Sequence, residues 1–193
     1  MKKLFIILPV VLVFGLVFFG CATPPTEDMN KAQDAVTRAE NDANAVTYAG
    51  DTVTAARNSL NKMQDEAKAK RYGPAKTLAS EAIDNAERAI ADGNAAAARA
   101  KDSATNLLNS LETPLAETSN AVDTAKNMQD APLDTAALSK DMDTANQTYA
   151  DAQQNLAADD YQSASAKGQS VKSQLSDINS QLNTAVQASS RKK

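Results

Sequence analysis

The spacing of the apolar residues is the feature that most constrains this chain. From Met29 to Ala185 apolar residues recur every three or four positions, and no useful stretch alternates with a period of two. This spacing puts apolar side chains on one face of an α-helix, so it predicts amphipathic helices almost throughout. Alanine fills most of these positions, with 38 alanines among 193 residues. Alanine seams allow helices to approach closely, but each contact buries little apolar area.

Aromatic residues are scarce. All four phenylalanines lie in residues 1–19, and the other rings are four tyrosines, which we expect to fill gaps left by small residues: Tyr48, Tyr72, Tyr149 and Tyr161. So few rings argue against a β-sandwich, a β-barrel or a deep ligand cavity. We therefore predict an all-α fold, in which antiparallel alanine-rich helical hairpins form an elongated bundle or short solenoid with coiled-coil-like seams. The sequence leaves open whether the bundle is compact or an extended rod.

The start of the chain has the pattern of an export signal. Two lysines precede an apolar run over residues 4–19, and Gly20 is followed by Cys21. A basic start, an apolar middle and a small residue before a cleavage point are typical of such signals. Residues 18–21, Phe-Phe-Gly-Cys, resemble a bacterial lipobox, although the first Phe departs from the usual aliphatic residue. The resemblance implies acylation of Cys21; an uncleaved N-terminal membrane helix is the alternative.

Lipidation would place the mature chain in the bacterial envelope. More than one acyl chain on a cysteine gives stable anchoring where a single chain does not. Ala22 stands where such lipoproteins carry Asp for inner-membrane retention, which favours the periplasmic side of the outer membrane. The expected organisation is a signal peptide (1–20), a lipidated linker (21–30), N-terminal helical hairpins (31–112), C-terminal helical hairpins (113–187) and a basic tail (188–193).

Glycine, proline and aspartate residues mark the expected helix ends. They predict seven helices, each roughly 22–38 Å long, with breaks at Gly50, Gly73-Pro74, Gly93, Pro114, Pro132 and Asp159-Asp160. The apolar phase continues through Gly50, so a single kinked helix is the alternative there. Residues 79–101 and 145–167 share several positions 66 residues apart, which suggests a duplicated hairpin. The alternative is that alanine-rich heptads resemble one another by composition alone.

A local motif adds a family resemblance. Residues 48–51 read Tyr-Ala-Gly-Asp, and residues 56–60 read Ala-Arg-Asn-Ser-Leu. With residues 31–110 as a whole, they resemble an uncharacterised class of bacterial envelope lipoproteins with Ala-rich helical hairpins, a Tyr-Ala-Pro-type turn and Ala-Arg-x-x-Leu. Gly50 replaces the expected Pro, and residues 72–74, Tyr-Gly-Pro, lack the Ala. The resemblance implies an envelope location and a helical fold, with no known activity.

The two ends of the chain carry a second resemblance. Cys21 lies near the start, and the sequence ends in Ser190-Arg191-Lys192-Lys193. With the alanine-rich heptads, these ends resemble the Braun-type murein lipoprotein, whose last lysine is joined to peptidoglycan, although that protein is one short rod. The resemblance implies Lys193 as a possible attachment site through its ε-amine. The alternative, which the sequence favours, is that the basic tail complements the dipole of the last helix.

Several kinds of chemistry are not expected. The chain has no histidine and one cysteine, so it lacks the usual general base, the commonest metal ligand and an intrachain disulfide. Asp141-x-Asp143 and Asp159-Asp160 do not have the spacing of a calcium loop and are interpreted as helix caps and N-terminal acids. We therefore predict no enzymatic activity, no cofactor and no metal site.

The net negative charge limits the classes of partner that the chain is expected to bind. Residues 21–193 carry 18 basic and 24 acidic side chains, a surface poorly suited to nucleic acid. We predict a non-enzymatic scaffold or spacer whose partners are the membrane, through its anchor, and an envelope protein or peptidoglycan. Self-association through the alanine seams is also open. The alternative is a tetratricopeptide-like module that binds a peptide or envelope protein in a concave groove.

Overall fold

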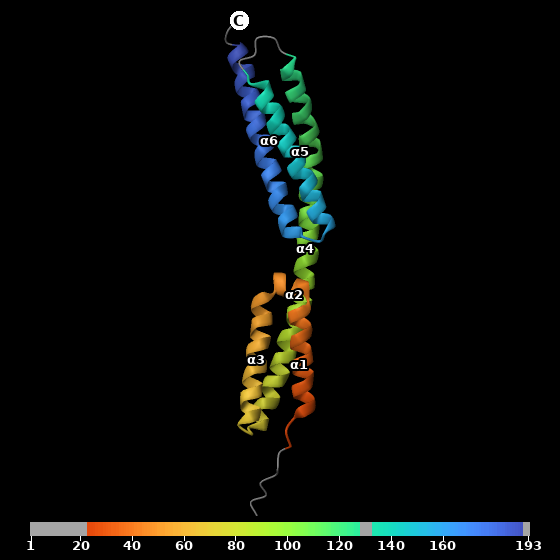
Figure 1. The fold of residues 1–193 in the computed structure, drawn as a ribbon, viewed down its shortest axis with the longest axis vertical. Coiled ribbons are helices and arrows are strands. Elements are labelled where there is room, and N and C mark those ends of the chain that lie inside the picture. Colours follow the sequence, from red (N-terminus) through yellow and green to blue (C-terminus); the bar gives the residue numbers. More distant parts are fainter. Residues whose placement is uncertain (1–22, 128–132, 191–193) are drawn as a thin grey trace, which may run out of the picture.

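In the part that the structure describes, residues 23–127 and 133–190 of a computed structural model, the chain is an elongated rod of helices joined by short turns (Figure 1). These residues form six helices and no strand: α1 (Thr26–Asn41), α2 (Ala43–Tyr48), α3 (Gly50–Lys68), α4 (Tyr72–Lys126), α5 (Thr135–Ala157) and α6 (Tyr161–Ser190). The prediction of an all-α fold of antiparallel helical hairpins is confirmed. Of the two shapes left open by the sequence, the extended rod is the one observed.

Helix α4 runs through both halves of the rod. Its first half packs with α1, α2 and α3 in an N-terminal bundle, and its second half packs with α5 and α6 in a C-terminal bundle. Its 55 residues correspond to about 82 Å at 1.5 Å per residue. No Cα atom of α1, α2 or α3 lies within 8 Å of a Cα atom of α5 or α6. We call the segment of α4 between the bundles, residues 93–104, the waist.

Two predicted helix breaks, at Gly93 and Pro114, are wrong because both residues lie inside α4. Gly93 is buried and has no positive φ, so it continues the helix. Pro114 has no N–H to donate to the carbonyl of Ser110, which costs the helix one backbone hydrogen bond. The neighbouring Leu111 and Leu115 are buried against the C-terminal bundle. Tertiary packing of this kind supplies most of a helix's stability, so α4 continues through the proline.

The breaks predicted at Gly50 and Asp159-Asp160 agree with the structure. The break predicted at Gly73-Pro74 lies slightly too late in the sequence, because α4 begins at Tyr72 and both residues belong to its first turn. The chain turns at residues 69–71 and 158–160, and it also ends a helix before Gly50. Because α3 returns beside α1 (Figure 1), the alternative of one kinked helix through Gly50 is wrong. An additional break falls at Asp42, whose Oδ1 accepts the N–H of Ala45 at 2.8 Å and so begins α2. Pro132 lies outside the described residues, between the end of α4 and the start of α5.

The α3–α4 and α5–α6 hairpins are built alike, 89 residues apart. At the two turns Lys70 and Asp159 adopt a positive φ, of 57° and 61°. In both turns the next backbone N–H donates to the carbonyl five residues earlier at 2.9 Å, as in a Schellman motif. Tyr72 and Tyr161 then begin α4 and α6. The duplicated hairpin predicted from residues 79–101 and 145–167 is wrong, because the turn expected at Gly93 in its first copy does not exist.

Buried positions correspond at the same 89-residue offset. The corresponding pairs are Val53 and Met142, Ala56 and Ala145, Met63 and Ala152, Ala75 and Ala164, Ala79 and Gly168, Ala82 and Val171, Ala86 and Leu175, Ala89 and Ile178, and Gly93 and Leu182. The two cores nevertheless differ in amino-acid composition. Ten of the fourteen buried residues of the N-terminal core are alanine, against three of thirteen in the C-terminal core. Larger side chains bury more apolar area, so the C-terminal core supplies more hydrophobic stabilisation per buried residue.

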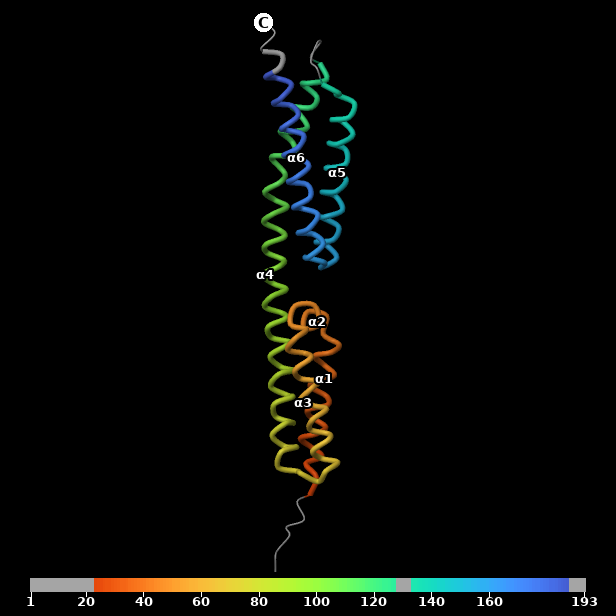
Figure 2. Tube along the Cα trace, turned by 90° about the vertical axis from the view of Figure 1, so that its left-hand side faces the viewer, coloured from red at the N-terminus to blue at the C-terminus, as the bar shows by residue number. Residues whose placement is uncertain are grey.

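The buried stripe of α4 explains why both bundles lie on the same side of that helix (Figure 2). Near the two ends of α4 the buried residues alternate by three and four, which is the spacing of a seven-residue repeat. Between Ala89 and Leu111 the steps from one such residue to the next are four, four and three, and this set of steps occurs twice; Ala100, which ends the first set, is only partly buried. Each set spans 11 residues. Seven-residue and 11-residue repeats drift around a straight helix in opposite directions, so the two drifts offset each other and the stripe stays on one side of α4.

Candidate functional sites at the poles and the waist

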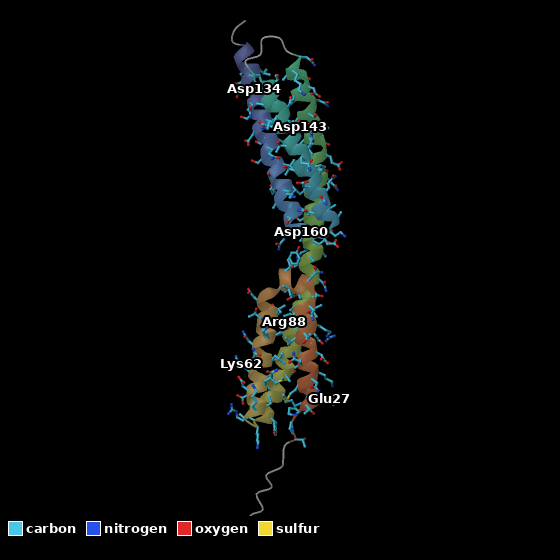
Figure 3. The ribbon with its side chains drawn as sticks, viewed as in Figure 1. Glu27, Lys62, Arg88, Asp134, Asp143 and Asp160 are labelled. Carbon is cyan, nitrogen blue, oxygen red and sulfur yellow. The ribbon has the colours of Figure 1, made fainter. Side chains whose placement is uncertain are left out.

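The predicted site residues, Cys21 and Lys193, both lie outside the described residues. The described chain leads towards them at opposite ends of the rod. Residues 23–25 run into the start of α1 at one end, which we call the N-terminal pole, and α6 ends at the other, the C-terminal pole (Figure 1). Figure 3 labels Glu27 near the N-terminal pole, Asp160 at the waist and Asp134 near the C-terminal pole. Acylation of Cys21 and attachment of Lys193 stay predictions.

At the N-terminal pole the incoming chain lies against the start of α4. Residues 23–28 and the first residues of α4 line an open hollow of about 570 Å³. The carbonyl of Pro25 accepts the N–H of Met29 at 2.9 Å, which begins α1. Lys76 on α4 places its Nζ 3.6 Å from Oδ2 of Asp28 on α1. The segment that follows Cys21 in the sequence is therefore held beside the α3–α4 turn.

Ion pairs surround this pole. Arg71 donates from both Nε and Nη2 to the carboxylate of Glu66, and Lys68 Nζ lies 3.3 Å from Asp65 Oδ1. The hydrogen bond from Arg71 holds the pKa of Glu66 below its usual value. Glu66 is 25% exposed and Arg71 is 61% exposed, so the carboxylate lies beneath the guanidinium that faces solvent. Exposed pairs of this kind contribute little to stability, but they determine which charge meets the surroundings.

The waist has a small core of its own. Ala97, Ala104, Tyr161 and Ala164 are buried there, and Tyr48, Ala100 and Leu156 pack against them. The Tyr161 hydroxyl donates to Asp159 Oδ1 at 2.6 Å, and this bond to a carboxylate raises the pKa of Tyr161. Side chains from the end of α2 and the start of α6 thus meet over the alanines of α4. The prediction that tyrosines fill small-residue gaps is confirmed for Tyr48 and Tyr161.

Tyr149 has the corresponding role inside the C-terminal bundle. It packs against the core and its hydroxyl donates to the Leu108 carbonyl at 3.3 Å. Burial, followed by the nearby Glu112 carboxylate, raises the pKa of Tyr149. A phenol is protonated at neutral pH, and the raised pKa extends this state further into the alkaline range, so the hydroxyl serves as a donor that links α5 to α4.

Gly93 allows two helices to approach closely, although the sequence predicts a helix end at this residue. A Cβ on Gly93 would lie 2.6 Å from the backbone N of Ala45, because α2 crosses directly over α4 at this point. Asn44 Nδ2 also donates to Asn94 Oδ1 at 2.8 Å across the same crossing. The signal that could have identified this role is the apolar phase of Ala89, Gly93 and Ala97, which passes through the glycine without a shift.

The start of α6 is expected to be sensitive to acid. Asp160 Oδ1 accepts the N–H of Ser163 at 3.1 Å, which confirms the interpretation of this aspartate as a helix cap. Hydrogen bonds from Ser163 hold the pKa of Asp160 below its usual 3.8. Because the folded-state pKa is the lower one, the cap stabilises the fold above pH 3.8 and loses this effect as the pH falls through the lowered pKa.

Circular dichroism melts across this pH range measure the effect. We expect the melting temperature of the native chain to fall more steeply with acid than that of Asp160→Asn, in which the cap does not titrate. Asp177→Asn removes an equal charge from an exposed position on α6 and is the matched control. A fall that is unchanged in Asp160→Asn, or equally reduced in Asp177→Asn, would contradict the assignment.

The described residues contain no cluster of side chains suited to holding a metal ion. No three His, Cys, Asp or Glu side chains gather in residues 23–127 and 133–190 in a way that would hold a metal ion. Asp141 and Asp143 are exposed on α5, on either side of the buried Met142. Of the helices described, none is both long enough and apolar enough to cross a membrane.

Comparison with known proteins identifies one region. Residues 27–105 match the family described as Domain of unknown function (DUF4398). The match covers α1, α2, α3 and α4 to just past the waist, and it is consistent with the resemblance of residues 31–110 to an uncharacterised family. The lipoprotein and Braun-type parts of the resemblances stay predictions. Comparisons with curated proteins and with solved structures gave no match.

Proposed function

We propose that this protein is a non-enzymatic, lipid-anchored spacer of the bacterial envelope, held on the periplasmic side of the outer membrane through Cys21. One observation carries the proposal: the described chain enters the rod at one pole and α6 ends at the opposite pole (Figure 1). An acylated Cys21 would hold the N-terminal pole at the membrane. The C-terminal bundle would then present its surface to a partner, an envelope protein or the cell wall, at a distance set by the rod.

The construction of α4 supports a spacing role. A single helix connects the two bundles, so its length of about 82 Å defines most of the reach. The waist contains five alanines between residues 95 and 100, and alanine has the highest helix propensity. The waist core around Tyr161 adds side-chain contacts on the side where the two bundles face each other. These features oppose bending where the rod is thinnest.

The anchor is tested by metabolic labelling with palmitate. We expect label in the native chain and its loss in Cys21→Ser, because the thioether and the N-terminal acylation both require the cysteine. Ala22→Ser, which alters the neighbouring residue and keeps the thiol, is the matched control and is expected to retain label. Label that persists in Cys21→Ser would reject the anchor.

The spacing role is tested by lengthening the waist. An insertion of ~18 helix-forming residues after Ala98 adds five turns, or about 27 Å, and preserves the facing of the two bundles. We expect electron cryomicroscopy of cells that express this variant to show a wider gap between the membrane and the structure that the rod contacts. The same insertion between α4 and α5 leaves the waist at its native length and serves as the control. Equal gaps in both variants would reject the spacer.

A further inference from the structure

Among residues 23–190, positive charge is concentrated at one end of the rod. Residues 62–76, the tip of the α3–α4 hairpin, contain five basic residues against two acidic ones: Lys62, Lys68, Lys70, Arg71 and Lys76, with Asp65 and Glu66. Residues 23–61 contain three basic and six acidic residues, and residues 77–190 contain seven basic and sixteen acidic residues. We call the five basic residues the basic tip. The remainder of the described rod is therefore negative on both sides of it.

The positive charges at this end face outward. All five residues of the basic tip are exposed. Lys76 is 73% exposed while its partner Asp28 is 36% exposed, which repeats the arrangement of Arg71 above Glu66. Lys70 is at the apex of the turn, in a left-handed conformation that directs the chain back into α4. Of the ion pairs found among the described residues, none involves Lys62 or Lys70.

Four carboxylates lie near the basic tip and reduce its charge. Glu27 and Asp28 begin α1, and Asp65 and Glu66 precede the turn. Glu27 is neutralised by Lys31, whose Nζ lies 2.7 Å away and holds the pKa of Glu27 below its usual value. Asp65 is matched by Lys68. The net charge of this pole is therefore positive. The carboxylates of Asp28 and Glu66 are less exposed than the basic side chains paired with them.

The basic tip lies at the pole from which the chain leads towards Cys21. Lys76 and the residues just after Thr23 line the same hollow. We propose that the basic tip binds the anionic phospholipid headgroups of the membrane that holds the anchor, which rests on the proposed function. Basic side chains next to a membrane anchor are attracted to anionic lipid over about a Debye length. The acidic length of the rod is repelled by the same surface, so the rod stands upright on it.

Fluorescence energy transfer from a membrane dye to the C-terminal bundle tests this orientation. The lipidated full chain, labelled through Asn183→Cys on α6, is reconstituted on vesicles of phosphatidylcholine alone and on vesicles that also contain phosphatidylglycerol. Residue 183 is exposed and belongs to the last part of α6, the helix that ends at the C-terminal pole. We expect transfer to be lost on the anionic vesicles, because the label moves away from the membrane, and to return at high salt. Equal transfer on both vesicles would overturn the proposal.

A matched pair of variants locates the effect. Lys68→Glu with Lys70→Glu and Lys76→Glu reverses the basic tip, and Lys126→Glu with Lys140→Glu and Lys172→Glu makes the same charge change in the C-terminal bundle. Circular dichroism confirms that both variants fold. We expect only the first to lose the difference between the two vesicles, and equal losses would overturn the proposal. Flotation with phosphatidylcholine vesicles tests the anchor separately: a chain that does not float refutes the proposed function, whereas one that floats without the lipid-dependent difference refutes the basic tip alone.

Discussion

Replacing Gly93 with alanine is expected to lower the free energy of unfolding of the N-terminal bundle by about 2 kcal/mol. The new Cβ would lie 2.6 Å from Ala45 N and 2.7 Å from both Ala45 Cα and Asn44 C. All three are backbone atoms, so no side-chain rotation relieves the clash and α2 must move away from α4. The movement also breaks the hydrogen bond between Asn44 and Asn94. Urea unfolding followed by circular dichroism measures the loss.

Gly50 provides the matched control for this substitution. It lies in the same bundle, and a Cβ built on it meets no atom within 4 Å. Gly50→Ala is therefore expected to raise the free energy of unfolding slightly, by about 0.4–1 kcal/mol, because alanine restricts the unfolded chain. If both variants were destabilised alike, the close approach of α2 would not be the cause. A Gly93→Ala variant as stable as the native chain would also contradict it.

Truncating Ile178 to alanine is expected to have the larger effect, a loss of about 3–4 kcal/mol in the C-terminal bundle. Ile178 is 1% exposed and belongs to the core in which most residues are larger than alanine. The side chain lies at the position that Ala89 occupies in the first hairpin, where the same volume is not needed. Removing it leaves a cavity between helices held apart by other large side chains, so the bundle recovers little by closing. Chemical unfolding measures the loss.

A valine-to-alanine truncation at an exposed position of the same helix serves as the comparison. Val186 is 55% exposed, and Val186→Ala is expected to change the free energy of unfolding by less than about 0.5 kcal/mol. Hydrogen exchange then locates the loss: Ile178→Ala should speed the exchange of amides in α5, α6 and the second half of α4. Faster exchange confined to α1 and α3 would contradict the division of the rod into two cores.

Most of the fold could be predicted from the sequence, because heptad spacing, caps and turn residues act locally. The turns before Tyr72 and Tyr161 follow from such signals, as does the cap by Asp160. The errors at Gly93 and Pro114 have a common cause: each residue disfavours a helix locally, and each is held in α4 by packing that the sequence does not display. Only the crossing of α2 explains why a glycine belongs at position 93.

The candidate sites also divide into those that local sequence patterns identify and those that depend on how the helices pack. Cys21 and Lys193 were identified from local patterns and lie outside the described residues. The basic tip combines Lys76 on α4 with residues of α3 and of the turn. Its relation to Asp28 and to the incoming chain depends on how α1 packs. The repeat was misplaced because alanines match alanines at many offsets, whereas the shared turn at Lys70 and Asp159 is a backbone feature.

The shared helix also determines how the molecule would carry mechanical load. Tension applied between Thr23 and the end of α6 pulls α1 and α6 in opposite directions along α4, since they meet the load at opposite ends of the rod. Both seams are then loaded in shear, and their side-chain contacts resist together along the length of each helix. A hairpin opened from its turn would instead lose its contacts one at a time. The alanine-lined seam of α1 buries less per contact, so under tension the N-terminal bundle would slip first.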